Sequence, residues 1–260
     1  MQFSIITVCF NAGDKLKNTI ENILCQSNSD FEIIVKDGGS TDGSLEAIPE
    51  DARIKVYSEK DKGIYDAMNQ AVSYASGDYV LFMNCGDSFF DEKVLENAGR
   101  FIYENPDRKI YYGDAFFCSA NHVISQPKEI TESICYRHMP NHQSCIFARE
   151  LWDDDGFDIK YKIRADYDFF LRSYFVKGIR PAYLGITVAS YEGGGYSESK
   201  ENRELDLKEH REIAVKYMGE KKANHYRRMM RLTLQPLRTK IAGSKAFSGA
   251  YNAVKKKIYH

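Results

Sequence analysis

Apolar and polar positions alternate along the first part of the chain in the manner of an α/β protein. Four short runs rich in β-branched and aromatic side chains indicate buried strands: residues 3–8, 31–36, 53–58 and 79–83. Apolar side chains at helical spacing predict helices between them: residues 16–24, 44–48 and 62–76. This alternation of strand and helix predicts a parallel sheet with helices on both of its faces.

The second part of the chain has a less regular pattern. Further strands are expected in three places: near residues 109–112, 143–148 and 182–189. Helices are expected over residues 166–177 and 202–218, and three consecutive glycines at 193–195 predict a loop. With a length of 260 residues, the pattern predicts one α/β domain with a mostly parallel sheet and a C-terminal helical extension.

Composition is typical of an intracellular globular protein. The six cysteines lack the spacing of a zinc site, and scattered cysteines in a large core are usually buried thiols in a reducing compartment. The chain starts directly in an expected strand, and no apolar run reaches the ~18 residues that a membrane span needs. We therefore expect a cytoplasmic protein.

Charge is distributed unevenly, although the net charge is only −1. Residues 221–260 carry eleven Lys and Arg and no Asp or Glu, so residues 1–220 carry 25 basic and 37 acidic side chains. Five apolar residues of this tail fall on one helix face: Tyr226, Met229, Met230, Leu234 and Leu237. The tail is expected either to dock on the body or to lie on an anionic membrane surface. The acidic body argues against nucleic acid as a partner.

Acidic loops follow two of the expected strands. Residues 37–43 (DGGSTDG) come directly after one strand, and residues 84–87 (NCGD) come after another. In an open parallel sheet, ligands bind at the carboxyl ends of the strands. Asp37 suits a contact with a base or ribose, and a single carboxylate such as Asp87 commonly holds Mg²⁺ or Mn²⁺ together with substrate phosphates. The alternative for each loop is an ordinary turn.

A third acidic group stands where a helix is expected to begin. Asp166 and Asp168 are two residues apart at this end of the helix. One interpretation is helix capping, for which Asp is well suited. The other is a general base at a helix N-terminus that faces a cleft.

Five segments together carry a resemblance to a known family. They are residues 7–11 (TVCFN), 37–43 (DGGSTDG), 61–69 (DKGIYDAMN), 84–87 (NCGD) and 165–168 (ADYD). In this order and spacing the chain resembles the inverting glycosyltransferases of family 2, which have the GT-A fold, over about residues 3–200. The resemblance implies one GT-A domain with three parts: a nucleotide-sugar-binding half at 1–115, an acceptor and catalytic-base half at 116–205, and a basic helical extension at 206–260.

The resemblance also implies roles for individual residues. Asp87 would ligate Mn²⁺ or Mg²⁺ at the diphosphate, and Asp166 would deprotonate the acceptor hydroxyl. Substrate contacts are implied for nine further residues: Asn11, Asp37, Gly39, Ser40, Asp61, Gly63, Asn69, Asn84 and His142.

Three positions depart from the family pattern. Gly38 stands where the family often has a second acid that contacts the base or ribose, and Gly86 stands where it often has a second acid beside the metal ligand, which leaves Asp87 as the one clear metal ligand. Ala165 replaces the Glu that usually precedes the base. Asp168 therefore remains an alternative to Asp166 as the base.

These features predict a metal-dependent transferase that moves a sugar from a nucleoside-diphosphate sugar, with UDP favoured, to a hydroxyl group. The expected acceptor is a glycan or a lipid-linked acceptor in cell-surface polysaccharide synthesis, on the inner face of the cell membrane. A nucleotidyltransferase is disfavoured, because residues 11–13 (NAG) lack the basic Gly-rich loop expected after the first strand. A non-catalytic nucleotide-sugar-binding protein would not need Asp87 and Asp166.

Overall fold

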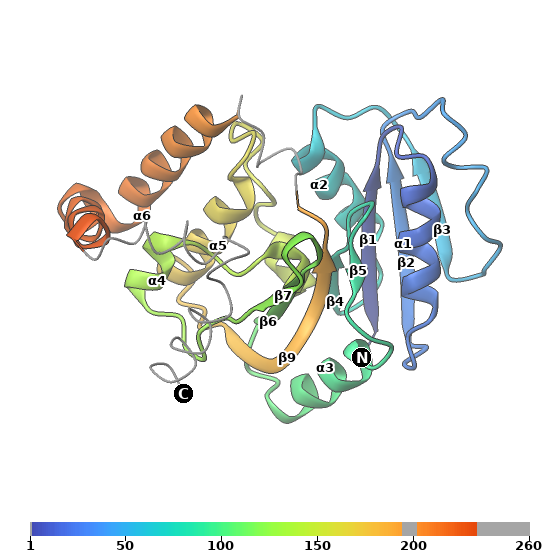
Figure 1. Ribbon diagram of the computed structural model, residues 1–260, viewed down its shortest axis with the longest axis horizontal. Coiled ribbons are helices and arrows are strands. Elements are labelled where there is room, and N and C mark those ends of the chain that lie inside the picture. Colours follow the sequence, from blue (N-terminus) through green and yellow to red (C-terminus); the bar gives the residue numbers. More distant parts are fainter. Residues whose placement is uncertain (1, 194–201, 233–260) are drawn as a thin grey trace.

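The computed structural model describes residues 2–193 and 202–232. Its centre is a nine-stranded sheet in which eight strands follow the order β3-β2-β1-β4-β8-β6-β9-β5, and β7 pairs with β6 (Figure 1). The strands are β1 (Phe3–Cys9), β2 (Phe31–Asp37), β3 (Ile54–Ser58), β4 (Tyr79–Phe82), β5 (Ser88–Phe89), β6 (Ile110–Phe117), β7 (His122–Ile124), β8 (Cys145–Ala148) and β9 (Ala182–Tyr191).

The first four strands are parallel, as the sequence predicts. β1 pairs with β2 from Phe3↔Phe31 to Cys9↔Asp37, and it pairs with β4 on its other side. Side chains of β1 alternate between the two faces, so that Ile5 and Ile6 lie in different hydrophobic clusters. The carboxyl ends of β1, β2 and β4 consequently lie at one edge of the sheet, where the acidic loops begin.

The second half of the sheet is mixed. β8 runs antiparallel to both β4 and β6, whereas β9 runs parallel to β6 and antiparallel to β5. The prediction of parallel strands is confirmed for β1 to β4. No local sequence pattern indicated the directions of the later strands. Because β8 pairs with β4, residues just before β8 lie near the loop that follows β4.

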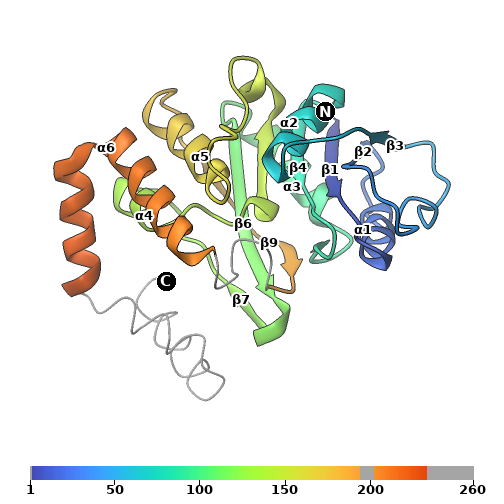
Figure 2. The same cartoon turned by 90° about the horizontal axis from the view of Figure 1, so that it is seen from above.

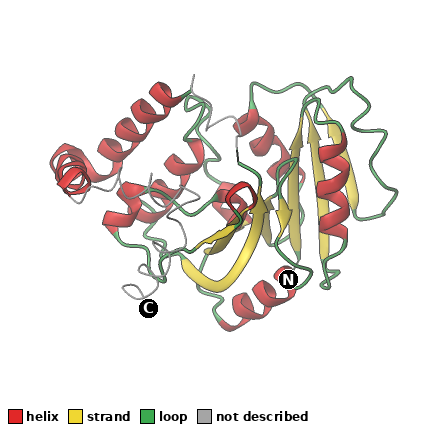
Figure 3. Cartoon of the chain, in the orientation of Figure 1, coloured by secondary structure: helices red, strands yellow, loops and turns green. Residues whose placement is uncertain are grey.

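Helices cover both faces of the sheet (Figures 1, 2 and 3). One apolar cluster packs α1 and α3 against one face, and a second packs α2, α4, α5 and α6 against the other. The helices are α1 (Asp14–Leu24), α2 (Ile64–Tyr74), α3 (Val94–Glu104), α4 (Glu132–Arg137), α5 (Ala165–Phe175) and α6 (Arg203–Leu232). This layering is that of the α/β class expected from the sequence.

The expected helix at residues 44–48 is wrong, since this segment is a turn and the chain passes from β2 to β3 without a helix. Ser44 is held by its neighbours instead: its hydroxyl accepts a hydrogen bond from Gly13 N at 2.8 Å, and its N–H donates to Asp42. Five residues are too few to offset the cost of helix nucleation against such contacts. α3 and α4 were not foreseen.

α6 is packed against the body and bends at Gly219, whose φ is 76°. Ile213 and Ala214 are fully buried in the cluster that contains α5. Beyond the bend, Lys222 forms an ion pair with Glu132 of α4 at 2.8 Å. Within the described residues, the tail therefore docks on the body at this point, while Leu234 and Leu237 lie outside the described residues. No helix in 2–193 or 202–232 has the length and apolar character needed to cross a membrane.

Glu32 ties the parallel strands together at the edge opposite the acidic loops. Its carboxylate accepts hydrogen bonds from Ser4 of β1 at 2.7 Å, Lys55 of β3 at 2.7 Å and the N–H of Ser76 at 2.6 Å, just before β4. Burial alone would raise the pKa of Glu32, but these hydrogen bonds lower it to about 2. One buried carboxylate thus links all four strands of the nucleotide-side sheet.

We predict that Glu32→Gln destabilises the fold in a pH-dependent way. A pKa lowered from 4.5 to about 2 corresponds to about 3 kcal/mol at neutral pH, present above pH 4.5 and lost as the pH falls towards 2. Thermal unfolding from pH 7 to pH 3 should show a smaller acid-induced loss for Glu32→Gln than for wild type. Glu104→Gln, at an exposed helix end, is the control. Equal pH slopes for all three proteins would contradict the prediction.

Candidate active site

Two loops from distant parts of the chain meet at the carboxyl edge of the sheet. Residues 84–87 follow β4, and His142–Ser144 form a 3-10 turn directly before β8. The Asn84 side-chain amide lies 3.1 Å from His142 Nε2, and Gln143 Nε2 donates to Asp87 Oδ2 at 3.0 Å. The pairing of β4 with β8 therefore places the His142 segment against the Asp87 loop.

His142 also reaches the acid at the start of α5. Its Nδ1 lies 3.5 Å from Asp166 Oδ2, and Asp166 Oδ1 accepts hydrogen bonds from the Tyr65 hydroxyl at 3.1 Å and from Tyr167 N at 2.8 Å. Burial would raise the pKa of Asp166, but His142, Arg164 and the Tyr167 N–H outweigh it and hold the pKa below its usual value. Asp166 is consequently ionised at neutral pH and able to accept a proton.

α6 fixes the segment that leads into Asp166. The buried carboxylate of Glu209 accepts hydrogen bonds from three consecutive backbone N–H groups, at residues 162–164. Arg164 adds a two-point ion pair with Asp206, at 2.6 and 3.0 Å. The position of Asp166 thus depends on side chains some forty residues further along the chain.

Asp168 faces a different environment from Asp166. It is fully buried, and its Oδ1 accepts hydrogen bonds from Lys216 Nζ at 2.8 Å and from the Tyr217 hydroxyl at 3.1 Å. Both partners belong to α6, so this carboxylate serves the contact between α5 and α6. Of the two acids, only Asp166 contacts His142.

Asp37 shapes the loop after β2 from within. It is fully buried, and its carboxylate accepts hydrogen bonds from Gly39 N at 2.9 Å, Ser40 N at 3.1 Å and the Ser58 hydroxyl at 2.6 Å. Burial acts to raise the pKa of Asp37. Hydrogen bonds, mainly from Ser40 and Ser58, outweigh this effect and hold the pKa below its usual value. Asp37 thus holds the backbone of this loop, in which Gly39 has a φ of 98°.

Asp61 occupies the space that a second acid after Asp37 would need. A Cβ on Gly38 would lie 2.8 Å from Asp61 Oδ2, so the Asp61 side chain would have to move to admit a side chain there. The same oxygen lies 3.7 Å from the ammonium of Lys36, which is fully buried. Asp61 thus places a carboxylate beside Gly38, the position at which this chain lacks the second acid that the family often has.

Asn11 joins the end of β1 to the same loop. Its Oδ1 accepts a hydrogen bond from Thr41 N at 2.9 Å, and its N–H donates to the Ser40 hydroxyl at 2.8 Å. Phe10 beside it is 67 % exposed, and its ring lies 3.3 Å from the position of a Cβ on Gly38. Phe10 is not among the residues expected to contact substrate, although a large aromatic residue in a polar loop is a signal that could have indicated it.

Two further expected residues lie in or before α2. Gly63 has a φ of 124° before the helix and donates its N–H to Asp61. Asn69, expected to bind substrate, uses both polar atoms on the backbone of Phe157, each at 2.8 Å. These two hydrogen bonds fix the loop before α5, and the second N–H and second lone pair of the amide leave the expected substrate contact a prediction.

A metal ion fits the chemistry at Asp87, although within the described ranges no three His, Cys, Asp or Glu side chains gather as a metal cluster. Asp87 is half-buried, and burial raises its pKa, an effect that Gln143, His142 and Lys15 only partly offset. The negative charge of this half-buried carboxylate is only partly balanced by neighbouring groups. Such a carboxylate suits a divalent cation whose other ligands are substrate phosphates and water.

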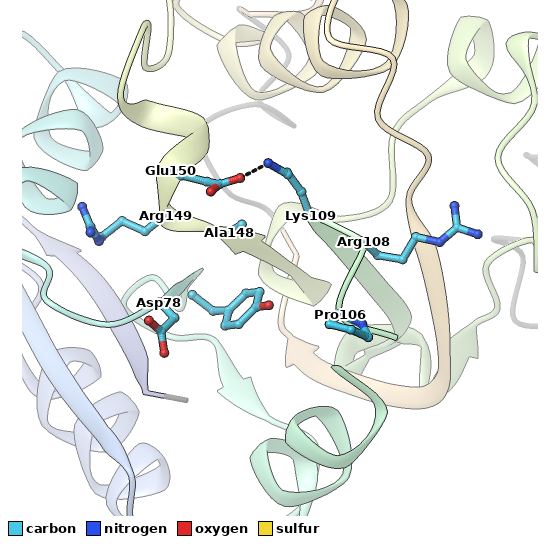
Figure 4. Close-up of a pocket in the computed structure, with 8 residues that line it drawn as sticks. Asp78, Pro106, Arg108, Lys109, Ala148, Arg149 and Glu150 are labelled. Atoms are coloured by element: carbon cyan, nitrogen blue, oxygen red, sulfur yellow. Dashed lines mark hydrogen bonds and ion pairs between the residues drawn. The ribbon is translucent and has the colours of Figure 1, made fainter. Parts of the chain in front are cut away.

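A pocket of 310 Å³ lies at the opposite edge of the sheet (Figure 4). Asp78 and Tyr79, at the start of β4, line it together with the Lys109–Glu150 ion pair. None of the expected site residues belongs to it. A second pocket, of 260 Å³, lies beside the start of α2 and includes Tyr65, whose hydroxyl contacts Asp166.

Comparison with known proteins agrees with this geometry. A family model described as "Glycosyl transferase family 2" matches residues 4–197. A PGL/p-HBAD biosynthesis glycosyltransferase of Mycobacterium bovis is 31% identical over 210 residues, which cover 78% of this chain and 82% of that protein.

Solved structures share the fold. S. aureus TarS in complex with UDP has a TM-score of 0.65 at 21% identity, with 83% of this chain and 64% of that one covered. The mannosyltransferase PcManGT from Pyrobaculum calidifontis, in complex with GDP-Man and Mn²⁺, has a TM-score of 0.66 at 19% identity over 83% of this chain and 64% of that one. This chain thus spans just under two thirds of each solved chain. The expected GT-A-like fold is confirmed, and the chain belongs to glycosyl transferase family 2.

Proposed function

We propose that this glycosyltransferase is metal-dependent and inverting, and that it uses a nucleoside-diphosphate sugar. The observation that carries the proposal is the link from Asp87's loop through Asn84 and His142 to an ionised Asp166. A site for the diphosphate and a base for the acceptor hydroxyl then lie at one edge of the sheet. Inverting transfer needs the donor and the acceptor hydroxyl to be held in line at the same time.

The proposed catalytic step depends on Asp166 as the general base. Asp166 takes the proton from the acceptor hydroxyl as its oxygen attacks the anomeric carbon from the side opposite the diphosphate. The bond between this carbon and the diphosphate oxygen breaks, and the configuration inverts. His142 and Tyr65 hold the carboxylate in place during the step. Asp168, which accepts a hydrogen bond from Lys216, has no role in this step.

Asp87 is the proposed metal residue, with Gln143 orienting its carboxylate. When Mn²⁺ or Mg²⁺ is bound, the cation neutralises charge on the departing diphosphate. The one carboxylate agrees with the way Mg²⁺ is usually held, by one or two carboxylates together with substrate phosphates. The Mn²⁺ in the PcManGT complex supports this choice of metal.

The donor is proposed to lie along the loop after β2, with its base on the exposed ring of Phe10. Asn11, Gly39 and Ser40 present backbone and side-chain groups there, and Asp61 and Gly63 form the neighbouring wall. The UDP held by TarS favours a UDP-sugar.

The proposed acceptor is a glycan or a lipid-linked acceptor in cell-surface polysaccharide synthesis, as the biosynthetic name of the mycobacterial relative suggests. The six free cysteines suit a reducing, cytoplasmic compartment. The basic residues of 221–260 would then hold the enzyme on the anionic inner face of the membrane.

Asp87→Ala should abolish Mn²⁺-dependent binding of UDP while the fold is retained, because the cation loses the carboxylate proposed to hold it. Calorimetry with and without Mn²⁺ measures this, and circular dichroism checks the fold. Glu92→Ala, which removes an exposed carboxylate five residues further on, is the control. Unchanged UDP affinity of Asp87→Ala in Mn²⁺ would refute the metal role.

Asp166→Asn should retain UDP binding and lose transfer by ~10²-fold or more, since the acceptor hydroxyl has no base. Asp168→Asn is the matched comparison: it should lower the melting temperature through its lost ion pair with Lys216 and keep turnover. Transfer and donor hydrolysis assays on both variants decide between the acids. An active Asp166→Asn beside an inactive, folded Asp168→Asn would move the base by two residues.

Binding to anionic vesicles should depend on the basic tail and weaken with salt, because each basic residue near such a surface contributes about 1 kcal/mol. Co-sedimentation of full-length protein with vesicles containing phosphatidylglycerol measures it. Replacing Lys255, Lys256 and Lys257 by Gln should reduce the bound fraction, whereas vesicles of neutral lipid should bind neither protein. Full-length protein that ignores anionic vesicles at low salt would exclude the membrane role.

A further inference from the structure

Lys15 lies beside the Asp87 loop, although it belongs to none of the five family-like segments. It stands in the first turn of α1, which packs on the face of the sheet next to β5 and the loop before it. Its Cδ and Nζ lie 3.5 and 3.8 Å from the place where a Cβ on Gly86 would stand. The Lys15 side chain thus crosses directly over the residue that precedes Asp87.

Glu192 is the ion-pair partner of Lys15. Lys15 Nζ lies 3.8 Å from Glu192 Oε2, and the two side chains are 63 % and 67 % exposed. The backbone carbonyl of Glu192, just past the end of β9, accepts a hydrogen bond from the Ser119 hydroxyl. An exposed pair at this distance is weak, so a stronger anion can replace the carboxylate.

Both charges act on the proposed metal residue. Lys15 Nζ lies 3.8 Å from the position of a Cβ on Gly86, the residue before Asp87, and 3.8 Å from Glu192 Oε2, so a cation and an anion lie close to the Asp87 loop. A nucleoside diphosphate carries a charge of about −3 at neutral pH, because its terminal phosphate has a second pKa near 6. A divalent cation leaves about one negative charge uncompensated, and one ammonium group matches it.

We propose that Lys15 is a second cation for the leaving diphosphate and that Glu192 is the counter-ion it releases when the donor binds. The inference rests on the proposed function and adds a residue to it. When the bond to the anomeric carbon breaks, its electron pair stays on the diphosphate oxygen. Lys15 remains an ammonium group throughout and transfers no proton. Glu192, freed from Lys15, turns back to solvent.

The chain supplies a matched control on the same helix. Lys17 pairs with Glu21 at the same 3.8 Å, and the two side chains are 46 % and 51 % exposed. This pair has the chemistry of Lys15 and Glu192, but no contact with Gly86 is found for it among the described residues. An effect specific to the diphosphate should appear at Lys15 and be missing at Lys17.

Calorimetry in Mn²⁺ with UDP and UMP tests the proposal on wild type, Lys15→Met, Glu192→Gln and Lys17→Met. Lys15→Met should weaken UDP binding about tenfold or more and change UMP binding far less, because UMP lacks the second phosphate. Glu192→Gln should strengthen UDP binding about two- to fivefold, since no carboxylate competes for Lys15. Lys17→Met should bind both nucleotides as wild type does.

The possible failures are distinguishable. UDP affinity of Lys15→Met equal to wild type overturns this inference alone, and an equal loss for UMP overturns it by indicating a structural role. Weaker UDP binding by Glu192→Gln overturns the counter-ion role and assigns Glu192 to the metal instead. Wild-type protein that binds neither UDP nor GDP in Mn²⁺ overturns the proposed function and this inference with it.

Discussion

One imidazole joins the two halves of this molecule. His142 lies 3.1 Å from the Asn84 amide on one side and 3.5 Å from the Asp166 carboxylate on the other. Asn84 follows a parallel strand, whereas Asp166 opens a helix in the irregular second half. The distance between the proposed metal residue and the proposed base is therefore set through His142, and transfer depends on that distance. The antiparallel pairing of β4 with β8 makes this link, because His142 stands just before β8.

The proposed base, Asp166, also needs a rigid support, and α6 contributes to it. Burying a carboxylate is costly unless its charge is paired or hydrogen-bonded, and the contact between α6 and the α5 segment contains two buried carboxylates. Glu209 is satisfied by three backbone N–H groups ahead of Asp166, and Asp168 is held by Lys216. α6 therefore belongs to the catalytic body up to its bend at Gly219 and cannot be treated as a separate tail over that part.

Local patterns predicted the parallel strands, the acidic loops and most of the helices, because these depend on side-chain periodicity and turn residues. They failed where a partner distant in sequence decides the outcome. Residues 44–48 have helical spacing but are tied to Gly13.

Other residues of the candidate site are distinguished by contacts made across the fold, although Tyr65 lies within the family-like segment 61–69. Gln143 and Tyr65 were passed over because their function is to touch Asp87 and Asp166 across the fold. Lys15 is one basic residue among several on an ordinary amphipathic helix, and only its position over Gly86 distinguishes it. Asp37, which the pattern did identify, is hydrogen-bonded to Gly39 N and the Ser58 hydroxyl, contacts that the local pattern does not indicate.

The most direct test of this account is a crystal structure of the protein with UDP and Mn²⁺. The account predicts the metal between the Asp87 carboxylate and the diphosphate, the base of UDP along the loop after β2, and Asp166 facing the open side of the terminal phosphate. A nucleotide bound at the opposite edge, in the pocket beside Asp78 and Glu150, would contradict it. A metal held without Asp87 would do so equally.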